Sequence, residues 1–260
     1  MTALLCVPLL IALPPRASAV TVDGEITVSA AISLKEALTD AAAIYVSRGG
    51  DHVVFNFGAS GMLEAQIKQG APVDLFVSAG DQQVGVLIAA GQADRQSRRV
   101  IARNALVLVV PNAAKSPPHG FEDLLSDRIR KIAIGEPKAV PAGTYAMQTL
   151  TALHLAEPLR DRLVYGANVR QVLDYVRRDQ VDAGIVYATD VAAAKDQVKI
   201  VATADPATHE PIEYPAVIIT GAAHATAAGK FLGFLESPEA QAIFASRGFE
   251  APTSTTQPTR

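Results

Sequence analysis

Strand-like and helix-like segments alternate along most of this chain, and this alternation limits the possible fold more than any other feature. Short apolar runs predict strands at residues 26–30, 52–57, 74–79, 104–111, 198–203 and 212–220, a strand and loop at 131–137, and a strand and turn at 181–190. Apolar residues at helical spacing predict helices at 33–48, 60–70, 81–91, 120–127, 141–153, 168–179, 224–235 and 237–247. This alternation is typical of α/β proteins with largely parallel sheets.

The strand-helix units fall into two groups, one on each side of the strand predicted at 104–111. The strand predicted at 212–220 would return the chain from the second group to the first. We therefore expect two lobes joined by two hinge strands, each lobe with a mixed, mostly parallel sheet flanked by helices. Lobe 1 would comprise residues 20–104 and 216–250, and lobe 2 residues 105–215. In such folds ligands bind beyond the carboxyl ends of the strands, at helix N-termini.

The two ends of the chain predict segments outside this fold. Residues 3–13 are almost wholly apolar and are followed by Ala17-Ser18-Ala19, a small-x-small pattern. They predict a secretory signal peptide at 1–19 and a periplasmic protein, although no positive charge precedes the apolar run. The alternative is a short buried helix; the run is shorter than the roughly 20 residues that span a bilayer. The tail at 251–260 is predicted to be disordered.

Composition excludes several classes of function. The net charge of the 260 residues is −3, and no long basic run suggests a nucleic-acid partner. The single cysteine, Cys6, lies in the expected signal peptide, so the mature chain would have no disulfide, thiolate nucleophile or cysteine-bound metal. Dinucleotide and P-loop motifs are absent. The segment Gly58-Ala59-Ser60-Gly61 lacks the second glycine position of a serine hydrolase elbow.

Five places share small, uncharged residues where a helix is about to begin. They lie at 31–33, 58–61, 141–144, 167–169 and 187–190. The first turn of each helix offers backbone N–H groups without an intrahelical acceptor, and the helix dipole adds partial positive charge. Together they would suit an oxyanion without any arginine or lysine. The alternative is ordinary capping: Ser33 with Glu36 reads as a capping box, and Ser60 as a helix N-cap.

Motifs at these places resemble a known family. They are Ala30-Ala31-Ile32-Ser33-Leu34, Phe57-Gly58-Ala59-Ser60-Gly61-Met62-Leu63, GAPVDLFVSA at 70–79, EPKAVPAGTYA at 136–146, NVRQVLDYV at 168–176, AGIVYATD at 183–190 and IEYP at 212–215. In this order they are similar to motifs of the periplasmic molybdate-binding proteins of ABC importers. The resemblance covers roughly residues 25 to 250.

The resemblance implies a hinged binding protein without catalytic activity that holds molybdate, and tungstate as well, between two lobes, and we expect it to be a monomer. Its ligand would be an oxyanion with no direct metal-cation ligand and no resident cofactor, and its partner the membrane permease of an ABC importer. The residues that match the family's oxyanion contacts are Ser33, Ser60, Ala142, Val169 and Tyr187. The serines would offer hydroxyl and N–H donors, Ala142 and Val169 backbone N–H donors, and Tyr187 its phenol.

Two departures from the family pattern lie beside these positions. Gly61 and Met62 stand where many members carry small hydroxyl residues, and Ala188-Thr189 replaces a commoner Gly-Ser pair. They could change loop shape or affinity. Two alternatives stay open: a binding protein for sulfate or another small anion on the same fold, and a secreted hydrolase that uses Ser33 or Ser60.

Overall fold

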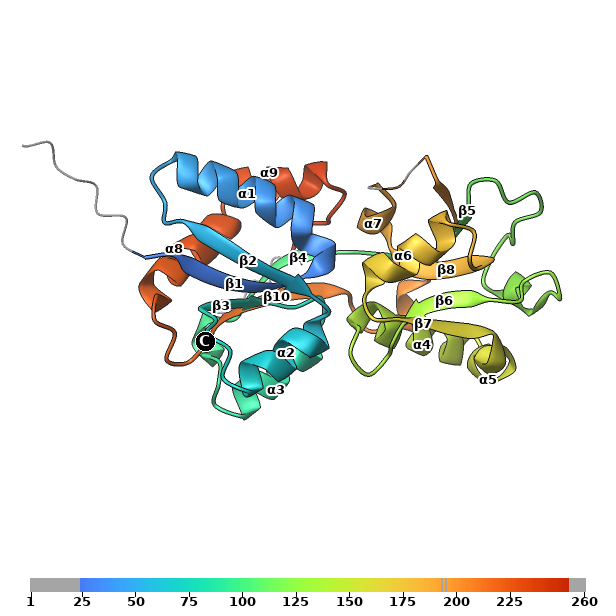
Figure 1. Cartoon of the computed structure of the whole chain (residues 1–260), viewed down its shortest axis with the longest axis horizontal. Coiled ribbons are helices and arrows are strands. Elements are labelled where there is room, and N and C mark those ends of the chain that lie inside the picture. The colour runs from blue at the N-terminus through green and yellow to red at the C-terminus, as the bar shows by residue number, and fades with distance from the viewer. Residues whose placement is uncertain (1–23, 193, 195, 253–260) are drawn as a thin grey trace, which may run out of the picture.

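The computed structural model describes residues 24–192, 194 and 196–252. The expected signal peptide at 1–19, including Cys6, lies outside the described residues, as do residues 253–260 of the expected tail. Two lobes are visible in Figure 1, each built around one five-stranded sheet.

The first lobe has the strand order β2-β1-β3-β10-β4. Its strands are β1 (Ile26–Ala31), β2 (Val53–Gly58), β3 (Leu75–Val77), β4 (Arg99–Arg103) and β10 (Glu213–Ile218). Its helices are α1 (Lys35–Ser47), α2 (Ser60–Lys68), α3 (Asp81–Ala89), α8 (Ala225–Leu235) and α9 (Pro238–Ser246), with short 3-10 turns η1 (Ile32–Leu34) and η2 (Arg95–Ser97). One face of the sheet is covered by α1, α8 and α9, and the other by α2 and α3 (Figure 1).

The second lobe has the strand order β7-β6-β8-β5-β9. Its strands are β5 (Leu106–Pro111), β6 (Ile132–Gly135), β7 (Leu163–Gly166), β8 (Ala183–Tyr187) and β9 (Val198–Thr203). Its helices are α4 (Pro141–Ala152), α5 (Ala156–Leu159), α6 (Val169–Arg177) and α7 (Ala188–Ala192), with 3-10 turns η3 (Glu122–Leu125), η4 (Arg160–Arg162) and η5 (Pro206–Thr208). Val172, Leu173 and Val176 of the amphipathic α6 are buried, as its helical period predicts.

Strand direction confirms the predicted fold class. In the first sheet β10 is antiparallel to both β3 and β4, whereas β1 is parallel to β2 and β3. In the second sheet β5 is antiparallel to β8 and β9, whereas β6 is parallel to β7 and β8. Each sheet therefore has one reversed strand among strands that run the same way, as in a mixed, mostly parallel sheet.

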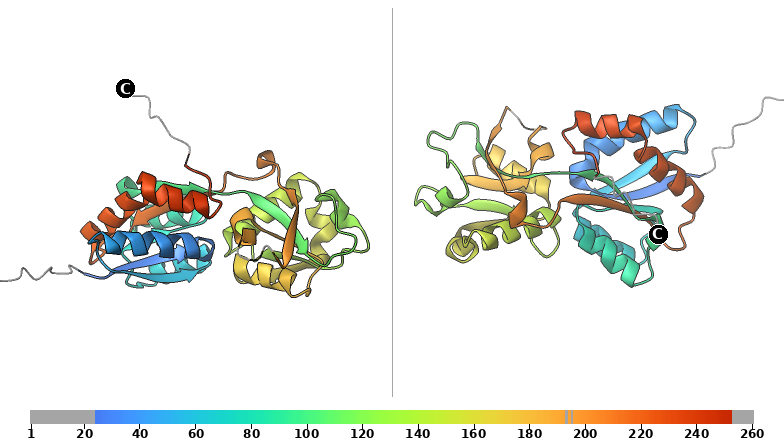
Figure 2. Two further views of the ribbon diagram at one scale, coloured as in Figure 1. Left: turned by 90° about the horizontal axis from the view of Figure 1, so that it is seen from above. Right: turned by 180° about the vertical axis from the view of Figure 1, so that it is seen from behind.

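The chain crosses between the lobes twice. The first crossing, at 104–105, joins β4 to β5, and the second, at 204–212, joins β9 to β10. The two crossings run side by side (Figure 2), and the backbone N–H of Asn104 donates to the carbonyl oxygen of Ile212 at 3.1 Å. The boundary expected at 215/216 falls inside β10, which pairs with β3 and β4 of the first sheet.

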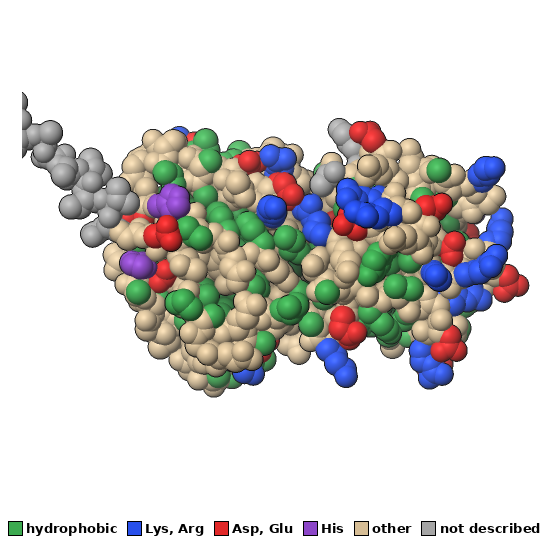
Figure 3. All heavy atoms as spheres, viewed as in Figure 1, with side chains coloured by type: hydrophobic (Ala, Val, Ile, Leu, Met, Phe, Trp, Pro, Cys, Tyr) green, Lys and Arg blue, Asp and Glu red, His purple; other side chains and the backbone are tan. Residues whose placement is uncertain are grey.

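The surface carries charges of both signs. On the face drawn in Figure 3, acidic side chains lie among basic ones, and basic side chains are most frequent toward the outer end of lobe 2. Within residues 24–252, leaving out 193 and 195, we find no helix with the length and apolar character needed to cross a membrane.

Candidate functional site

The five residues predicted to contact an oxyanion all line one small cavity where the lobes meet. Lobe 1 contributes Ser33 and Ser60, and lobe 2 contributes Ala142, Val169 and Tyr187. The other lining residues are Ala31, Ile32, Gly58, Ala59, Ala79, Val140 and Pro141, so none of the lining residues is charged. The cavity has a volume of about 10 Å³. Sites for organic ligands are far larger, at roughly 300–1,000 Å³, so this cavity is too small for an organic ligand.

The topology explains why residues so distant in sequence meet here. Ser33 lies in η1 directly after β1, and Ser60 is the first residue of α2, just after β2. Ala142 and Val169 are in the first turns of α4 and α6, and Tyr187 ends β8. Parallel strands bring their carboxyl ends to one edge of a sheet, and each helix then directs unpartnered N–H groups and its dipole toward that edge.

A close contact between two glycines fixes the start of α4. A Cβ atom on Gly143 would lie 2.0 Å from the carbonyl oxygen of Gly135 at the end of β6, so a larger residue does not fit. The Thr144 hydroxyl donates to the carbonyl oxygen of Pro137 at 2.8 Å and closes the preceding turn. Gly143 therefore shapes the helix start that presents Ala142.

The capping roles predicted for Ser33 and Ser60 were wrong. The N-cap of α1 is Leu34, and Ser33 Oγ instead lies 3.2 Å from the phenol oxygen of Tyr214. The N-cap of α2 is Ala59, and Ser60 Oγ accepts a hydrogen bond from the backbone N–H of Ala79 at 3.0 Å. Both serine side chains are buried beside the cavity.

Tyr187 lines the cavity from lobe 2 and also contacts lobe 1. It is 1% exposed, and its hydroxyl donates to the carbonyl oxygen of Ala79 in lobe 1 at 3.4 Å, the long limit of a hydrogen bond. Burial raises the pKa of the Tyr187 phenol well above its ordinary value, and the nearby phenols of Tyr214 and Tyr145 add to this. Tyr187 therefore keeps its proton and acts as a hydrogen-bond donor.

An ion-pair cluster joins the lobes next to the cavity. Arg170 of α6 donates to both carboxylate oxygens of Glu36 of α1, at 3.1 and 2.5 Å. The Arg170 Nε lies 2.9 Å from Oδ1 of the fully buried Asp190, without the alignment of a hydrogen bond. Burial raises the pKa of Asp190 to about 6, although the Arg170 charge opposes this shift.

Sequence reasoning missed this cluster because it assigned Glu36 to a capping box. One signal was available in the sequence. Arg170 occupies the first turn of α6, where a positive charge opposes the helix dipole, so its position indicates a partner outside the helix.

A further contact between the lobes uses the backbone alone. The N–H of Gly61, in the first turn of α2, donates to the carbonyl oxygen of Ala139 at 3.0 Å. The sequence placed Gly61 at a helix start and as a departure from the family pattern, and neither of these indicated this contact.

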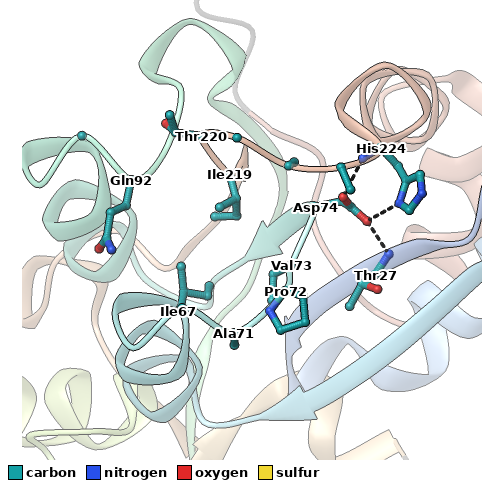
Figure 4. Close-up of a pocket in the computed structure, with 15 residues that line it drawn as sticks. Thr27, Ile67, Ala71, Pro72, Val73, Asp74, Gln92, Ile219, Thr220 and His224 are labelled. Carbon is teal, nitrogen blue, oxygen red and sulfur yellow. Dashed lines mark hydrogen bonds and ion pairs between the residues drawn. The ribbon is translucent and has the colours of Figure 1, made fainter.

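A larger cavity, of about 440 Å³, lies near the opposite, amino-terminal end of β1 and β3. Polar groups in its lining bind one another (Figure 4): the Asp74 side chain accepts hydrogen bonds from the backbone N–H of Thr27 and of His224, both at 2.9 Å. His224 Nδ1 also lies 3.3 Å from Asp74 Oδ2. These contacts tie the start of α8 to the sheet. In the described part of the chain no group of three or more His, Cys, Asp or Glu residues is placed to hold a metal ion.

Comparison with known proteins assigns the family. Residues 26–250 match the model of the bacterial extracellular solute-binding proteins. The chain belongs to this family. Among solute-binding relatives, YvgL of Bacillus subtilis, named provisionally as an ABC transporter substrate-binding lipoprotein, is 40% identical over 87% of this chain and 86% of its own length. The molybdate-binding protein ModA of Haemophilus influenzae is 36% identical over 88% of this chain and 91% of its own length.

A solved structure extends the comparison to three dimensions. The periplasmic molybdate-binding protein of Azotobacter vinelandii has a TM-score of 0.77 and 30% sequence identity with this solute-binding protein. The match covers 87% of this chain and 99% of the other. The two-lobed architecture is therefore that of this group of solute-binding proteins.

Proposed function

We propose that this protein captures molybdate or tungstate between its two lobes and delivers the anion to the membrane permease of an ABC importer. The observation that carries the proposal is the convergence of Ser33, Ser60, Ala142, Val169 and Tyr187 on one small cavity without a charged lining residue. Relatives named as molybdate-binding proteins support the same ligand.

The chemistry of the cavity favours a fully deprotonated oxyanion. Molybdate and tungstate are dianions at neutral pH that only accept hydrogen bonds, and the serine and tyrosine hydroxyls and helix N-termini are donors. Hydrogen bonds to charged groups are about twice as strong as neutral ones, so uncharged donors suffice. Phosphate keeps a proton near pH 7 and would need an acceptor carboxylate, which the lining residues lack.

The proposed mechanism is closure of the lobes around the anion. An ion that contacts Ser33 and Ser60 on one lobe and Ala142, Val169 and Tyr187 on the other stabilises the closed arrangement, because only that arrangement offers every contact. The permease would recognise the closed form. The protein would act in the periplasm as a monomer, with no catalytic step and no resident cofactor.

Titration of the purified protein with molybdate, tungstate, sulfate and phosphate tests the proposal. We expect calorimetry to detect tight binding of molybdate and tungstate. At a ligand concentration of 100 Kd, the free energy of unfolding should rise by about 2.7 kcal/mol. If neither molybdate nor tungstate gives binding heat or thermal stabilisation, this function is refuted. Sulfate that binds as tightly as molybdate would favour the alternative of a sulfate-binding protein.

A further inference from the structure

The hydroxyl groups of Ser33 and Tyr214 form a buried pair behind the cavity. Their oxygens lie 3.2 Å apart, and by distance alone either could donate. Ser33 lines the cavity, whereas Tyr214 comes from β10 and is fully buried. The direction of this hydrogen bond decides whether the Ser33 proton is available to a ligand.

Asn104 sets that direction. Its Oδ1 accepts from the backbone N–H of Ala105 at 2.9 Å, which identifies the other atom of the amide as nitrogen. This Nδ2 donates to the phenol oxygen of Tyr214 at 3.0 Å and to Thr189 Oγ1 at 2.8 Å. An amide nitrogen can only donate, so the Tyr214 oxygen accepts from Asn104.

The Tyr214 proton then has one suitable acceptor among its described neighbours, Ser33 Oγ. Burial raises the pKa of Tyr214, so the phenol keeps this proton. If Ser33 donated to Tyr214 instead, the phenol proton would be buried without a partner, which costs free energy. The favoured chain of donors therefore runs from Asn104 to Tyr214 to Ser33, and the Ser33 proton remains free for the cavity.

The Ser60 hydroxyl also accepts a hydrogen bond and keeps its own proton, although its donor is a backbone N–H group. The backbone N–H of Ala79 can only donate, and it points at Ser60 Oγ at 3.0 Å. The Ser60 proton is therefore also free. Both serine hydroxyls of lobe 1 have an acceptor position already filled and a proton left to donate.

We propose that Asn104 and Tyr214 are positioning residues that hold the Ser33 hydroxyl in a donor role and so select fully deprotonated oxyanions over anions that keep a proton. This inference rests on the proposed function. A dianion such as molybdate or sulfate accepts from Ser33. Phosphate carries a P–OH group near pH 7 that needs an acceptor. Ser33 could accept from it only by turning its own proton to another acceptor, and Tyr214, which donates to Ser33, is not one.

Asn104 connects this series of hydrogen-bond donors to both lobes. It lies in the first crossing, while Tyr214 follows the second crossing and Thr189 belongs to α7 of lobe 2. The same amide nitrogen thus contacts lobe 2 and orients a donor of lobe 1.

Tyr214→Phe in the full chain tests the proposal. The variant removes the phenol that fixes the orientation of the Ser33 hydroxyl, so this hydroxyl can turn either its proton or its oxygen toward a ligand. We expect the Kd for molybdate to rise and the ratio of the phosphate Kd to the molybdate Kd, measured by calorimetry at pH 7, to fall by about tenfold or more, the lower end for a hydrogen bond to a charged group. Tyr45→Phe, which alters a phenol of α1 that donates to Asp51, is the matched control and should leave the ratio unchanged.

A general loss of packing would weaken both anions equally and leave their ratio constant, which would overturn the inference. Wild-type protein that binds neither molybdate, tungstate nor sulfate would instead overturn the proposed function, and this preference with it. Wild-type binding of a dianion with an unchanged ratio in Tyr214→Phe would overturn the role of the donor chain alone.

Asn104→Asp provides a second test that reverses the chain. A carboxylate accepts where the amide donates, so the phenol of Tyr214 would donate to it and Ser33 would donate to the phenol. We expect Asn104→Asp to raise the molybdate Kd at least fivefold more in the wild-type background than in the Tyr214→Phe background. An equal loss in both backgrounds would indicate simple charge repulsion by the new carboxylate and would contradict the proposal.

Discussion

Gly61 and Ala139 belong to different lobes, yet their backbones are in direct hydrogen-bonded contact. A Cβ atom on Gly61 would lie 2.7 Å from the carbonyl oxygen of Ala139 and 2.9 Å from its Cα atom. Both of these neighbours are backbone atoms, so they cannot rotate away. The lobes reach this separation because residue 61 has no side chain.

Gly61→Ala should therefore weaken ligand binding without lowering the stability of the protein. Alanine at a helical position is favoured over glycine by about 0.5–1 kcal/mol, so the free energy of unfolding without ligand should stay equal or rise. The Kd for molybdate should rise at least tenfold, because the added methyl holds the lobes apart. Calorimetry and urea unfolding measure the two quantities.

Gly85→Ala is the matched control for this substitution. Gly85 lies within α3, and a Cβ there would meet no heavy atom within 4 Å. It should bring the same helix benefit with unchanged affinity. If Gly61→Ala and Gly85→Ala bind molybdate equally, the contact with Ala139 does not limit closure.

Glu36→Gln should shorten the lifetime of the closed complex. The Arg170 and Glu36 side chains are 24% and 39% exposed, so the pair is partly screened by solvent. Partly exposed pairs contribute about 0.2–1 kcal/mol, which corresponds to an increase in the molybdate dissociation rate of up to about fivefold. Stopped-flow displacement by tungstate measures this rate.

Glu239→Gln is the control for Glu36→Gln, because Glu239 pairs with Arg48 inside lobe 1. It should leave the dissociation rate unchanged. Equal rates in the two variants would show that the pair between the lobes does not hold them closed.

Tyr187→Phe should weaken molybdate binding by about 1.5–3 kcal/mol, the range for a hydrogen bond to a charged group, because the phenol of the wild type turns from the Ala79 carbonyl to the anion. This is roughly a 10- to 150-fold increase in Kd. Tyr165→Phe, at an exposed position of β7 in the same lobe, should bind like the wild type. Unchanged affinity in Tyr187→Phe would remove its phenol from the site.

Asp190 should make the stability of the protein depend on pH. Burial raises its pKa to about 6 from the ordinary value of 3.8, so the folded state holds this proton more tightly than the unfolded state. The free energy of unfolding should then fall as pH rises from about 4 to 6 and change little from this source above pH 6. Asp190→Asn should flatten the fall in urea unfolding experiments. Parallel pH profiles for the two proteins would exclude Asp190 as the source.

The sequence predicted most of the strands and missed β4 and β7. Both are edge strands, whereas β2 and β9, at the other edges of the two sheets, have more apolar sequences and were predicted. β4 reads Arg-Val-Ile-Ala-Arg, whose outer residues are polar, and β7 has four residues with only Gly166 buried. Edge strands bury less surface, so their residues carry a weaker apolar signal.

The helix starts that form the candidate site were predictable, but the hydrogen bonds of its side chains were not. The resemblance selected Ser33, Ser60 and Tyr187, and the structure brings them to one cavity. The partners of the serines come from residues far along the chain, such as Tyr214 for Ser33. Local rules assign a serine before a helix to a cap, and only the tertiary structure shows the competing partner.

The paired crossings make lobe 2 a continuous insertion into a lobe that is divided in the sequence. β10 lies between β3 and β4 in the first sheet, and α8 and α9 follow it in the chain. During synthesis the amino-terminal part of lobe 1 therefore emerges with its sheet incomplete, while lobe 2 already has all five strands once β9 has been made. Because domains tend to fold as units during synthesis, the second lobe can reach its native structure first, and the first lobe completes its sheet around a strand supplied after it.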